Sequence, residues 1–261
     1  MPKAIIIIGT FFIWGTSLLG QVPQNLWFHS ITKSDGLSLT DNRDFFLDSE
    51  GFVWISSFGG LNRFDGKSIK KYYTDSSDST SLSDDMINGS FFEDSDQNIW
   101  FCTNTSIEKY NRKHDNFEHF ELFDKHGSII KSNYNAFFLE NNRYLWVSAS
   151  EKNNIFKFDI QTQKYTQLND SLNYHIYFHP IANLDGTLKY IFVSNGSNKL
   201  GLERIEIKGD KLISTTYFDS SEIESRRFNV QSVIYENESQ VWFSSRQGIV
   251  KWDMTSSEAT R

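Results

Sequence analysis

The sequence predicts an all-β fold assembled from one repeated sheet unit, and three observations support this prediction. Tryptophans recur in matching apolar contexts with a spacing of 46 residues at Trp54, Trp100 and Trp146, and the same motif returns at Phe192 and Trp242. A residue pair that is apolar at all positions except Asn183, and then a polar turn, precede the anchor in each unit, which is the pattern of a β-hairpin. Outside the first twenty residues, no segment keeps apolar positions at the helical period of 3.6.

Each unit is predicted to contain four strands, and the first unit shows them most clearly. An apolar pair at 45–46, a polar turn at 48–51 and the anchor run at 53–56 form a hairpin. A third strand at 61–65 alternates its residues with period two, and a fourth run follows at 69–73. In the later units the anchor runs lie at 99–102, 145–148, 191–194 and 241–244, the third strands at 107–111, 156–159, 202–206 and 249–253, and the fourth runs at 117–120, 165–168 and 216–218.

Four strands in a period of roughly 40 to 50 residues are the signature of a β-propeller blade. The predicted fold class is therefore an all-β propeller of four-stranded antiparallel blades, with five repeats in this chain. One blade cannot cover both of its own faces. We therefore expect the anchor aromatics to fill the space between neighbouring blades.

The two ends of the chain bear on how such a ring closes. The fifth unit stops after its third predicted strand at 249–253, whereas a spare strand at 26–31 precedes the first unit. An N-terminal strand that completes the last blade would close a five-bladed ring and bury its sheet edges. The alternative is that the five units are part of a seven-bladed ring. Both interpretations stay open at this point.

Residues 1–20 differ in composition from the rest of the chain. Lys3 precedes an uncharged stretch from Ala4 to Leu19 that closes on Gly20, a pattern typical of a secretory signal peptide. Leu18 fits poorly at a small-x-small cleavage site, so an uncleaved anchor is the alternative. The domain boundaries predicted are a signal peptide at 1–20 and a propeller domain at 21–261.

Composition narrows the classes of function. The chain has 261 residues, and its 16% aromatic content argues against disorder. Its single cysteine, Cys102, cannot form an internal disulfide. The net charge is −7, and the 26 lysines and arginines are spread along the chain. Nucleic-acid binding is disfavoured, because it needs clustered basic residues.

Residues 48–65 carry a specific resemblance. They read Asp-Ser-Glu-Gly-Phe-Val-Trp-Ile-Ser-Ser-Phe-Gly-Gly-Leu-Asn-Arg-Phe-Asp, which follows D-x-x-G-x-[LIV]-W-[IV]-G-T-x-x-G-[LI]-x-[RK]-[FY]-D except for Ser56-Ser57 in place of Gly-Thr. This segment resembles the two-component regulator propeller repeat, found in the periplasmic sensor region of hybrid two-component histidine kinases of Bacteroidetes-type bacteria. The resemblance covers nearly all of residues 21–261 and is weakest in the third and fourth units.

The resemblance implies a periplasmic sensor domain that recognises an oligosaccharide or a partner protein and that could form a homodimer. The kinase of such systems is absent from this chain, so a membrane link is expected only through that missing part or an uncleaved anchor. The sequence holds no glycine-rich phosphate loop and no G-x-S-x-G elbow, so we expect binding without catalysis. The alternatives are a stand-alone scaffold for protein–protein interaction and a metal-dependent propeller lyase.

Two features suggest a metal site, and both have simpler interpretations. The turn at 94–98 alternates oxygen donors as a calcium loop does, but it lacks the glycine and the distal glutamate of such loops. Asx-rich tight turns explain it. His175 and His179 share one face of a predicted strand, but zinc would need a third ligand. We expect neither a metal nor another cofactor.

A basic residue recurs on the predicted third strand of each unit. Together these residues could surround an anionic ligand. Neighbouring carboxylates favour solvated or salt-bridged strand faces instead. The residues are Arg63, Lys109, Lys157, Arg204 and Lys251.

The ligand-binding residues are expected on the loops between blades and on the loops after each anchor strand, which share one face of a propeller. The longer loops lie at 74–86, 121–134, 169–178 and 219–229, and the shorter ones at 57–60, 103–106, 149–154, 195–200 and 245–248. Sugars favour aromatic rings and planar polar groups. The residues placed to supply them are Arg43, Asn88, Tyr134, Tyr174 and Arg246.

Overall fold

The computed structural model describes most of the chain after residue 29. The described ranges are 30–39, 41–124, 126–130, 133–149, 154–168, 177–194, 201–209, 211–219, 232–237, 239–245, 248–256 and 258–260. The signal peptide predicted at 1–20 and most of the spare strand predicted at 26–31 lie outside these residues.

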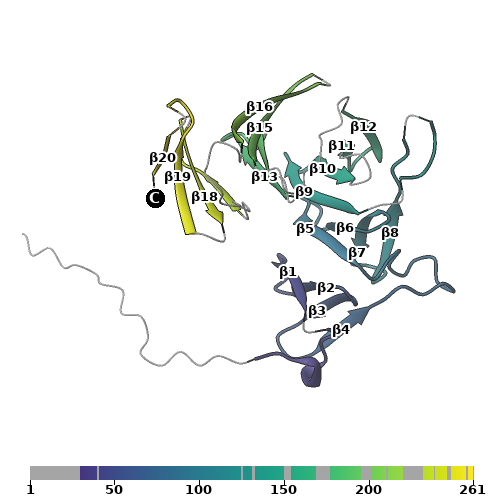
Figure 1. The fold of residues 1–261 in the computed structure, drawn as a ribbon. Helices are drawn as coiled ribbons and strands as arrows, with labels where there is room; N and C mark the ends of the chain where they lie inside the picture. Colours follow the sequence, from purple (N-terminus) through teal and green to yellow (C-terminus); the bar gives the residue numbers. More distant parts are fainter. Residues whose placement is uncertain are drawn as a thin grey trace, which may run out of the picture. The chain divides into compact units, whose positions relative to one another are not determined.

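The described residues form five antiparallel four-stranded units in chain order, as predicted (Figure 1). A short 3₁₀ helix, η1 (Lys33–Asp35), precedes them. The first two units are β1 (Asn42–Leu47), β2 (Val53–Ser57), β3 (Gly60–Phe64) and β4 (Ile69–Tyr72), then β5 (Ile87–Glu93), β6 (Ile99–Thr103), β7 (Ile107–Asn111) and β8 (Asn116–Phe120). The third and fourth are β9 (Tyr134–Glu140), β10 (Tyr144–Ala149), β11 (Asn154–Asp159) and β12 (Lys164–Gln167), then β13 (Tyr177–Ala182), β14 (Leu188–Ser194), β15 (Gly201–Lys208) and β16 (Lys211–Asp219). The fifth is β17 (Ser232–Tyr235), β18 (Gln240–Ser245), β19 (Gly248–Asp253) and β20 (Glu258–Thr260).

Consecutive strands pair with each other inside every unit, which makes each unit a meander. The second and third units are joined by a single parallel pairing between Gly89 and Ala136. Gly89 has φ +75°, and a Cβ there would lie 2.6 Å from the carbonyl oxygen of Ala136. Glycine is therefore required where these two innermost strands approach each other.

The fifth unit corrects one prediction. It does not stop after its third strand, because β20 pairs with β19 through Lys251 and Thr260. The Asp253 carboxylate accepts hydrogen bonds from the backbone N–H groups of Thr255 and Ser256, and this turn reverses the chain. The fourth strand of this unit is therefore supplied by the C-terminal residues. The number of blades in a complete ring stays a prediction.

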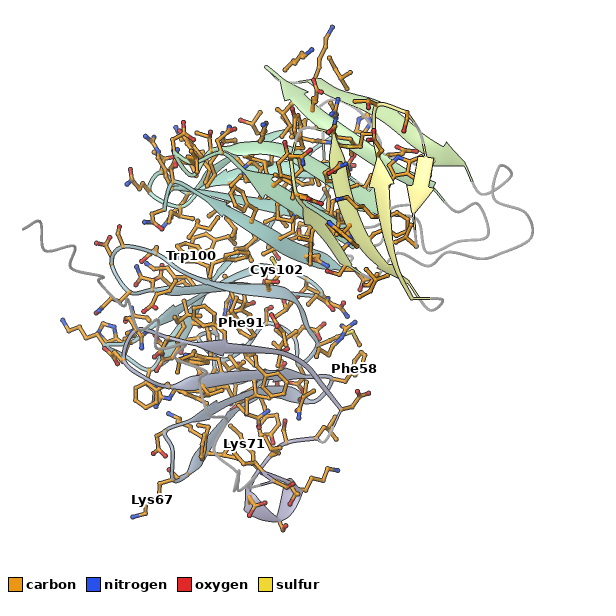
Figure 2. The ribbon with its side chains drawn as sticks, turned by 90° about the vertical axis from the view of Figure 1, so that its left-hand side faces the viewer. Phe58, Lys67, Lys71, Phe91, Trp100 and Cys102 are labelled. Carbon is orange, nitrogen blue, oxygen red and sulfur yellow. The ribbon has the colours of Figure 1, made fainter. Side chains whose placement is uncertain are left out.

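The anchor aromatics pack between units, as expected. Trp54 is fully buried and meets the ring of Tyr110 of the second unit at 4.7 Å between centroids. Trp100, 1% exposed, lies in one apolar cluster with Phe158 of the third unit. Figure 2 shows Trp100 among the packed sheets, together with Phe91 and Cys102.

The same arrangement continues towards the C-terminus. Trp146 clusters with Ile191 and Val193 of the fourth unit, and Phe192 clusters with Trp252 of the fifth. Burial of such aromatic rings removes roughly 150–250 Å² each from water, so the gaps between units hold the core of this fold. At the two ends of the series, outward-facing apolar side chains are exposed, including Phe45 at 61% and Trp242 at 36%.

The acidic turns bind the anchor tryptophans. In four units the indole N–H donates to a carboxylate six residues earlier. The pairs are Trp54 with Asp48 at 2.8 Å, Trp100 with Asp94 at 2.7 Å, Trp146 with Glu140 at 3.2 Å and Trp242 with Glu236 at 2.5 Å. The fourth unit has Phe192, which has no such donor, and Gly186 stands at the corresponding turn position. The acidic residues of these turns are therefore part of the blade packing.

Candidate functional site

Two of the sequence-predicted site residues meet at the end of the first two units where β1 and β5 begin. The Arg43 guanidinium donates from Nη1 to Asn88 Oδ1 at 2.8 Å. Asn88 Nδ2 in turn donates to Asn104 Oδ1 at 2.9 Å. The guanidinium lies over the ring of Phe58, 4.5 Å from its centroid. Phe58 lies at the surface (Figure 2) and is 42% exposed.

In this group, which we call the Arg43 cluster, Arg43 and the ring of Phe58 are exposed, Asn104 is half-buried and Asn88 is buried. Such a combination suits the hydroxyl groups and the apolar ring face of a sugar. Asn104 and Phe58 were not singled out from the sequence. The signal that could have found them was present, because both lie in the short loops predicted to face a ligand, at 103–106 and 57–60.

Tyr134 has a different position from the one expected. It was placed outside the core, but it is fully buried in the cluster between the second and third units. Its hydroxyl accepts a hydrogen bond from the Leu122 backbone N–H at 2.9 Å and donates to the Leu122 carbonyl at 3.2 Å. Burial raises the pKa of Tyr134 to about 12. Tyr174, Arg246 and His175 lie outside the described residues.

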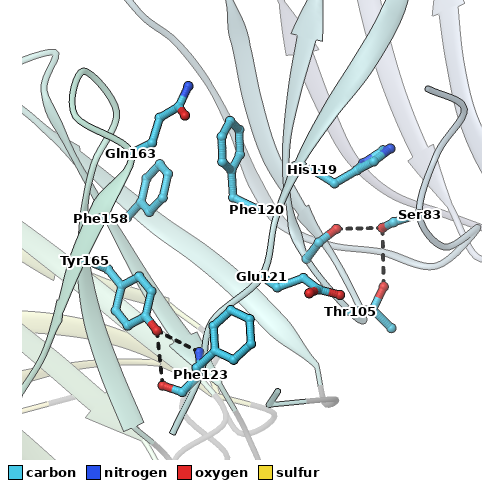
Figure 3. A pocket seen from close by; sticks show the side chains of 10 residues that line it. Ser83, Thr105, His119, Phe120, Glu121, Phe123, Phe158, Gln163 and Tyr165 are labelled. Atoms are coloured by element: carbon cyan, nitrogen blue, oxygen red, sulfur yellow. Dashed lines mark hydrogen bonds between the residues drawn. The ribbon is translucent and has the colours of Figure 1, made fainter. Parts of the chain in front are cut away.

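A cavity of about 420 Å³ opens between the outer strands of the second and third units (Figure 3). Three of the loops predicted to face a ligand contribute to it. Its lining residues are Ser83, Thr105, Ser106, His119, Phe120, Glu121, Phe123, Phe158, Gln163 and Tyr165. We call it the Ser83 pocket.

One wall of the Ser83 pocket is built on a buried carboxylate. Glu108, on β7, is fully buried, and its Oε1 accepts hydrogen bonds at 2.5 Å from the hydroxyls of Ser83 and Ser106. The Ser83 hydroxyl also lies 2.8 Å from that of Thr103. A buried ionised group requires such partners, because isolated burial costs several kcal/mol. The network therefore holds the Ser83 loop against the second unit.

His119 completes this network. Its Nδ1 lies 2.7 Å from Glu108 Oε2, and its Nε2 lies 3.2 Å from the Ser79 carbonyl oxygen. The hydrogen bond to the Glu108 carboxylate raises the pKa of His119. In a nucleophile–base relay the histidine binds the serine hydroxyl. Here Ser83 and His119 both bind the carboxylate, which is a positioning arrangement.

The opposite wall of the Ser83 pocket is aromatic. Phe120 and Phe158 pack at 5.3 Å between ring centroids, and the Tyr165 hydroxyl accepts the Phe123 backbone N–H at 2.9 Å. Phe123 is 38% exposed, and the exposed Glu121 carboxylate lies between it and Thr105 (Figure 3). The pocket therefore combines ring faces with hydroxyl, amide and carboxylate groups, which is the composition of a ligand site with directional polar contacts.

Three observations bear on the two metal sites considered from the sequence. Within the described ranges, no three His, Cys, Asp or Glu side chains lie close enough together to hold a metal ion. In the turn that resembled a calcium loop, Asp94 accepts from Trp100 and from the backbone N–H of Asn98 at 2.9 Å. Burial lowers the pKa of His179 to about 4, so this side chain is neutral at pH 7.

The basic residues of the third strands lie opposite their own anchors. Lys157 and Lys251 each lie 5.0 Å from the ring centroid of the tryptophan in their unit. They also bind the turn carboxylates, Lys157 with Glu140 at 2.6 Å and Lys251 with Glu236 at 2.9 Å. These contacts stay within one unit, so they join the anchor and its turn instead of facing a shared ligand.

Two parts of the sequence are similar to known proteins. A sequence model described as two component regulator propeller matches residues 81–105. Over 60 residues the chain is 42% identical to Histidine kinase P4 of Formosa agariphila. This match covers 23% of this chain and 4% of that protein.

Solved structures share the fold at low sequence identity. The extracellular domain of a Bacteroides thetaiotaomicron protein described as a hybrid two-component system superposes with a TM-score of 0.64 at 18% identity, covering 89% of this chain and 31% of that one. An auxiliary nutrient binding protein of the same species has a TM-score of 0.53 at 11% identity, covering 84% and 56%. The chain thus spans about a third of the first structure. No helix among the described residues is long and apolar enough to cross a membrane.

Proposed function

The chain carries a two-component regulator propeller repeat on a β-propeller fold, and from this premise we propose that it is the exported, ligand-recognising part of a hybrid two-component sensor. The local identity to a histidine kinase supports this proposal. In it, the chain binds its ligand in the periplasm and does not transform it. The signal would pass to a kinase that lies outside this chain, through a membrane segment or a partner protein, with a homodimer as the signalling form.

The observation that carries the proposal is the Ser83 pocket. Loops from two neighbouring units converge on it, and its buried Glu108 network keeps one wall in place. We propose that the ligand is an oligosaccharide whose ring packs on Phe123 while its hydroxyls bond to Glu121 and Thr105. The Arg43 cluster is proposed as a second contact on the loop-bearing end, together with Tyr174 and Arg246.

Isothermal titration of residues 21–261 against defined oligosaccharides tests this function. The expected result is saturable binding of one glycan class with no product detected by chromatography. Phe123→Ala should weaken that binding by up to about tenfold, since loss of a stacked ring costs roughly 0.5–1.5 kcal/mol. Tyr73→Ala is the matched control, because Tyr73 is an aromatic residue of comparable exposure, 45%, that does not line the pocket.

The alternatives give different results. Glycan binding that Phe123→Ala leaves unchanged would refute the pocket as the site. Turnover of a polymer that stops with a chelator or with the double change of His175 and His179 to Ala would show the lyase instead. No binding of any glycan, with a specific protein partner recovered, would show the scaffold.

A further inference from the structure

A guanidinium group fills the gap between the turns of the first and second units. Arg112 follows β7, and its Nη1 lies 3.0 Å from Asp48 Oδ2 while its Nη2 lies 2.9 Å from Glu93 Oε1. Its Nε donates to the Gln97 carbonyl at 2.6 Å. The Asp48 side chain is fully buried and also accepts the anchor indole N–H. This fork of donors matches the carboxylates around it.

The next gap has the same turn without the arginine. The turn after β7 closes with Asp115 N–H donating to the Asn111 carbonyl at 2.8 Å, and the turn after β11 closes with Gln163 N–H donating to Asp159 at 2.8 Å. Asp115 and Gln163 have nearly equal φ angles, 56° and 57°. The residue after Asn111 is Arg112, so the residue after Asp159, Ile160, is its equivalent in the third unit.

The carboxylate that would face this arginine is present. Asp94 is the equivalent of Asp48, 46 residues later, and both accept the N–H of their anchor tryptophan. Where Ile160 replaces the arginine, the structure has a cavity of about 410 Å³. Asp94, Asp96, Ile160 and Gln163 are among its lining residues.

The carboxylates of this cavity have no arginine beside them, whereas Arg112 pairs with the carboxylates between the first and second units. Asp94 is 8% exposed, and the Asn98 amide donates to its Oδ2 at 2.9 Å in the place that the guanidinium takes at Asp48. An amide supplies a donor but no charge. Lys109 also lines the cavity, but it pairs with Glu118 at 3.3 Å. No ion pair joins Asp94 or Asp96 to a cation in the part of the chain that the structure describes.

We propose that this cavity between the second and third units binds a guanidinium group, either of a small guanidino compound or of an arginine in a partner peptide. The recognising groups are the Asp96 carboxylate and the Gln163 amide, with the charge of Asp94 behind them, because the Asn98 amide and the Trp100 indole already donate to Asp94 Oδ2. An arginine-type fork fits better than an ammonium, because two oxygens and a planar amide wall favour a planar donor. This cavity shares Gln163 with the Ser83 pocket, but Asp96 and Ile160 line only this cavity, so variants at these two residues test it separately from the proposed sensor function.

Titration of the full chain with agmatine, monitored by calorimetry or amide chemical shifts, tests the site. Cadaverine is the matched dication, with an ammonium group in place of the guanidinium, and an Arg-containing tripeptide beside its Lys counterpart distinguishes the peptide source. We expect agmatine to bind at least about tenfold more tightly than cadaverine, the ratio that one further charge-assisted hydrogen bond supplies. Binding of the Arg peptide but not of agmatine would assign the site to a partner.

Ile160→Arg should fill the cavity with the missing side chain. It should raise the midpoint of thermal unfolding and abolish agmatine binding, whereas Ile160→Leu should change neither. Asp96→Asn, at an exposed position, should weaken agmatine about tenfold without loss of folding. Equal binding by Ile160→Arg, equal affinity for cadaverine, or no binding of agmatine or the Arg peptide up to about 10 mM, well beyond an ordinary weak site, would overturn the proposal.

Discussion

The hydrogen bond between a buried anchor tryptophan and its turn carboxylate can be tested by the change Trp54→Phe. Trp54 is fully buried, and its indole N–H donates to Asp48 at 2.8 Å. The substitution keeps an aromatic ring and removes the donor. A hydrogen bond to a charged group contributes about 1.5–3 kcal/mol, and the smaller ring leaves a space that adds to the loss. We expect a loss of about 2–3 kcal/mol in the free energy of unfolding.

The matched control is Trp242→Phe. This anchor has the same motif, but it is 36% exposed and its partner Glu236 is exposed as well. Solvent can replace that bond, so the loss should be clearly smaller. Urea unfolding followed by tryptophan fluorescence measures both, and the Trp54 change should lower the melting temperature by about 4–8 °C or more. Equal losses at the two positions would refute the reasoning that burial between units determines the energy.

Three further predictions concern charged groups. Glu108 raises the pKa of His119, so the stability that the protonated His119 contributes is fully present below its ordinary pKa of 6.5 and is lost as the pH rises through the raised pKa. In urea titrations, His119→Gln should remove this loss of stability on the alkaline side. The pKa of His179 is lowered to about 4, so the stability that the neutral ring contributes is present above pH 6.5 and is lost as the pH falls from 6.5 to 4. His179→Leu should reduce this fall in the free energy of unfolding between pH 6.5 and pH 4. Arg112→Met should cost about 3 kcal/mol, the lower end for a broken buried pair because Arg112 is 17% exposed, whereas the exposed Arg143→Met should change stability little.

Each of these has an outcome that would contradict it. Retention of the alkaline loss in the glutamine variant would show that other groups cause it. An unchanged acid limb without His179 would mean that this ring is not desolvated in the folded protein. Similar losses for the two arginine variants would show that the carboxylates at Arg112 are hydrated.

The repeat itself was readable from the sequence because its signals are local. Each hairpin needs only an apolar run, a polar turn and a second apolar run, and period two follows from strand geometry. The spacing from Trp54 to Trp100 therefore predicted the units, and the need to cover both faces of a sheet predicted that these rings lie between units. The strand β20 was missed because Glu258–Thr260 has no apolar alternation, and its pairing depends on a turn made by Asp253.

The candidate sites were less readable, because exposure and proximity depend on which units meet. Tyr134 is the last residue of a predicted loop, and it is buried only because the second and third units close over it. Arg43 and Asn88 are 45 residues apart in sequence, and a hydrogen bond joins them across two units. The Ser83 pocket draws His119 from one fourth strand and Tyr165 from another, and neither differs in sequence pattern from an ordinary strand residue.

Strand content, the repeat and its anchor residues thus follow from the order of amino acids, because hydrogen bonding and side-chain alternation act over a few neighbouring residues. The cavities, their charge balance and the partners of buried carboxylates follow from contacts between units. A one-residue difference such as Arg112 against Ile160 shows why. Both residues fit the same turn and both lie where the neighbouring unit supplies a carboxylate, so the arginine forms an ion pair there and the isoleucine leaves an open cavity.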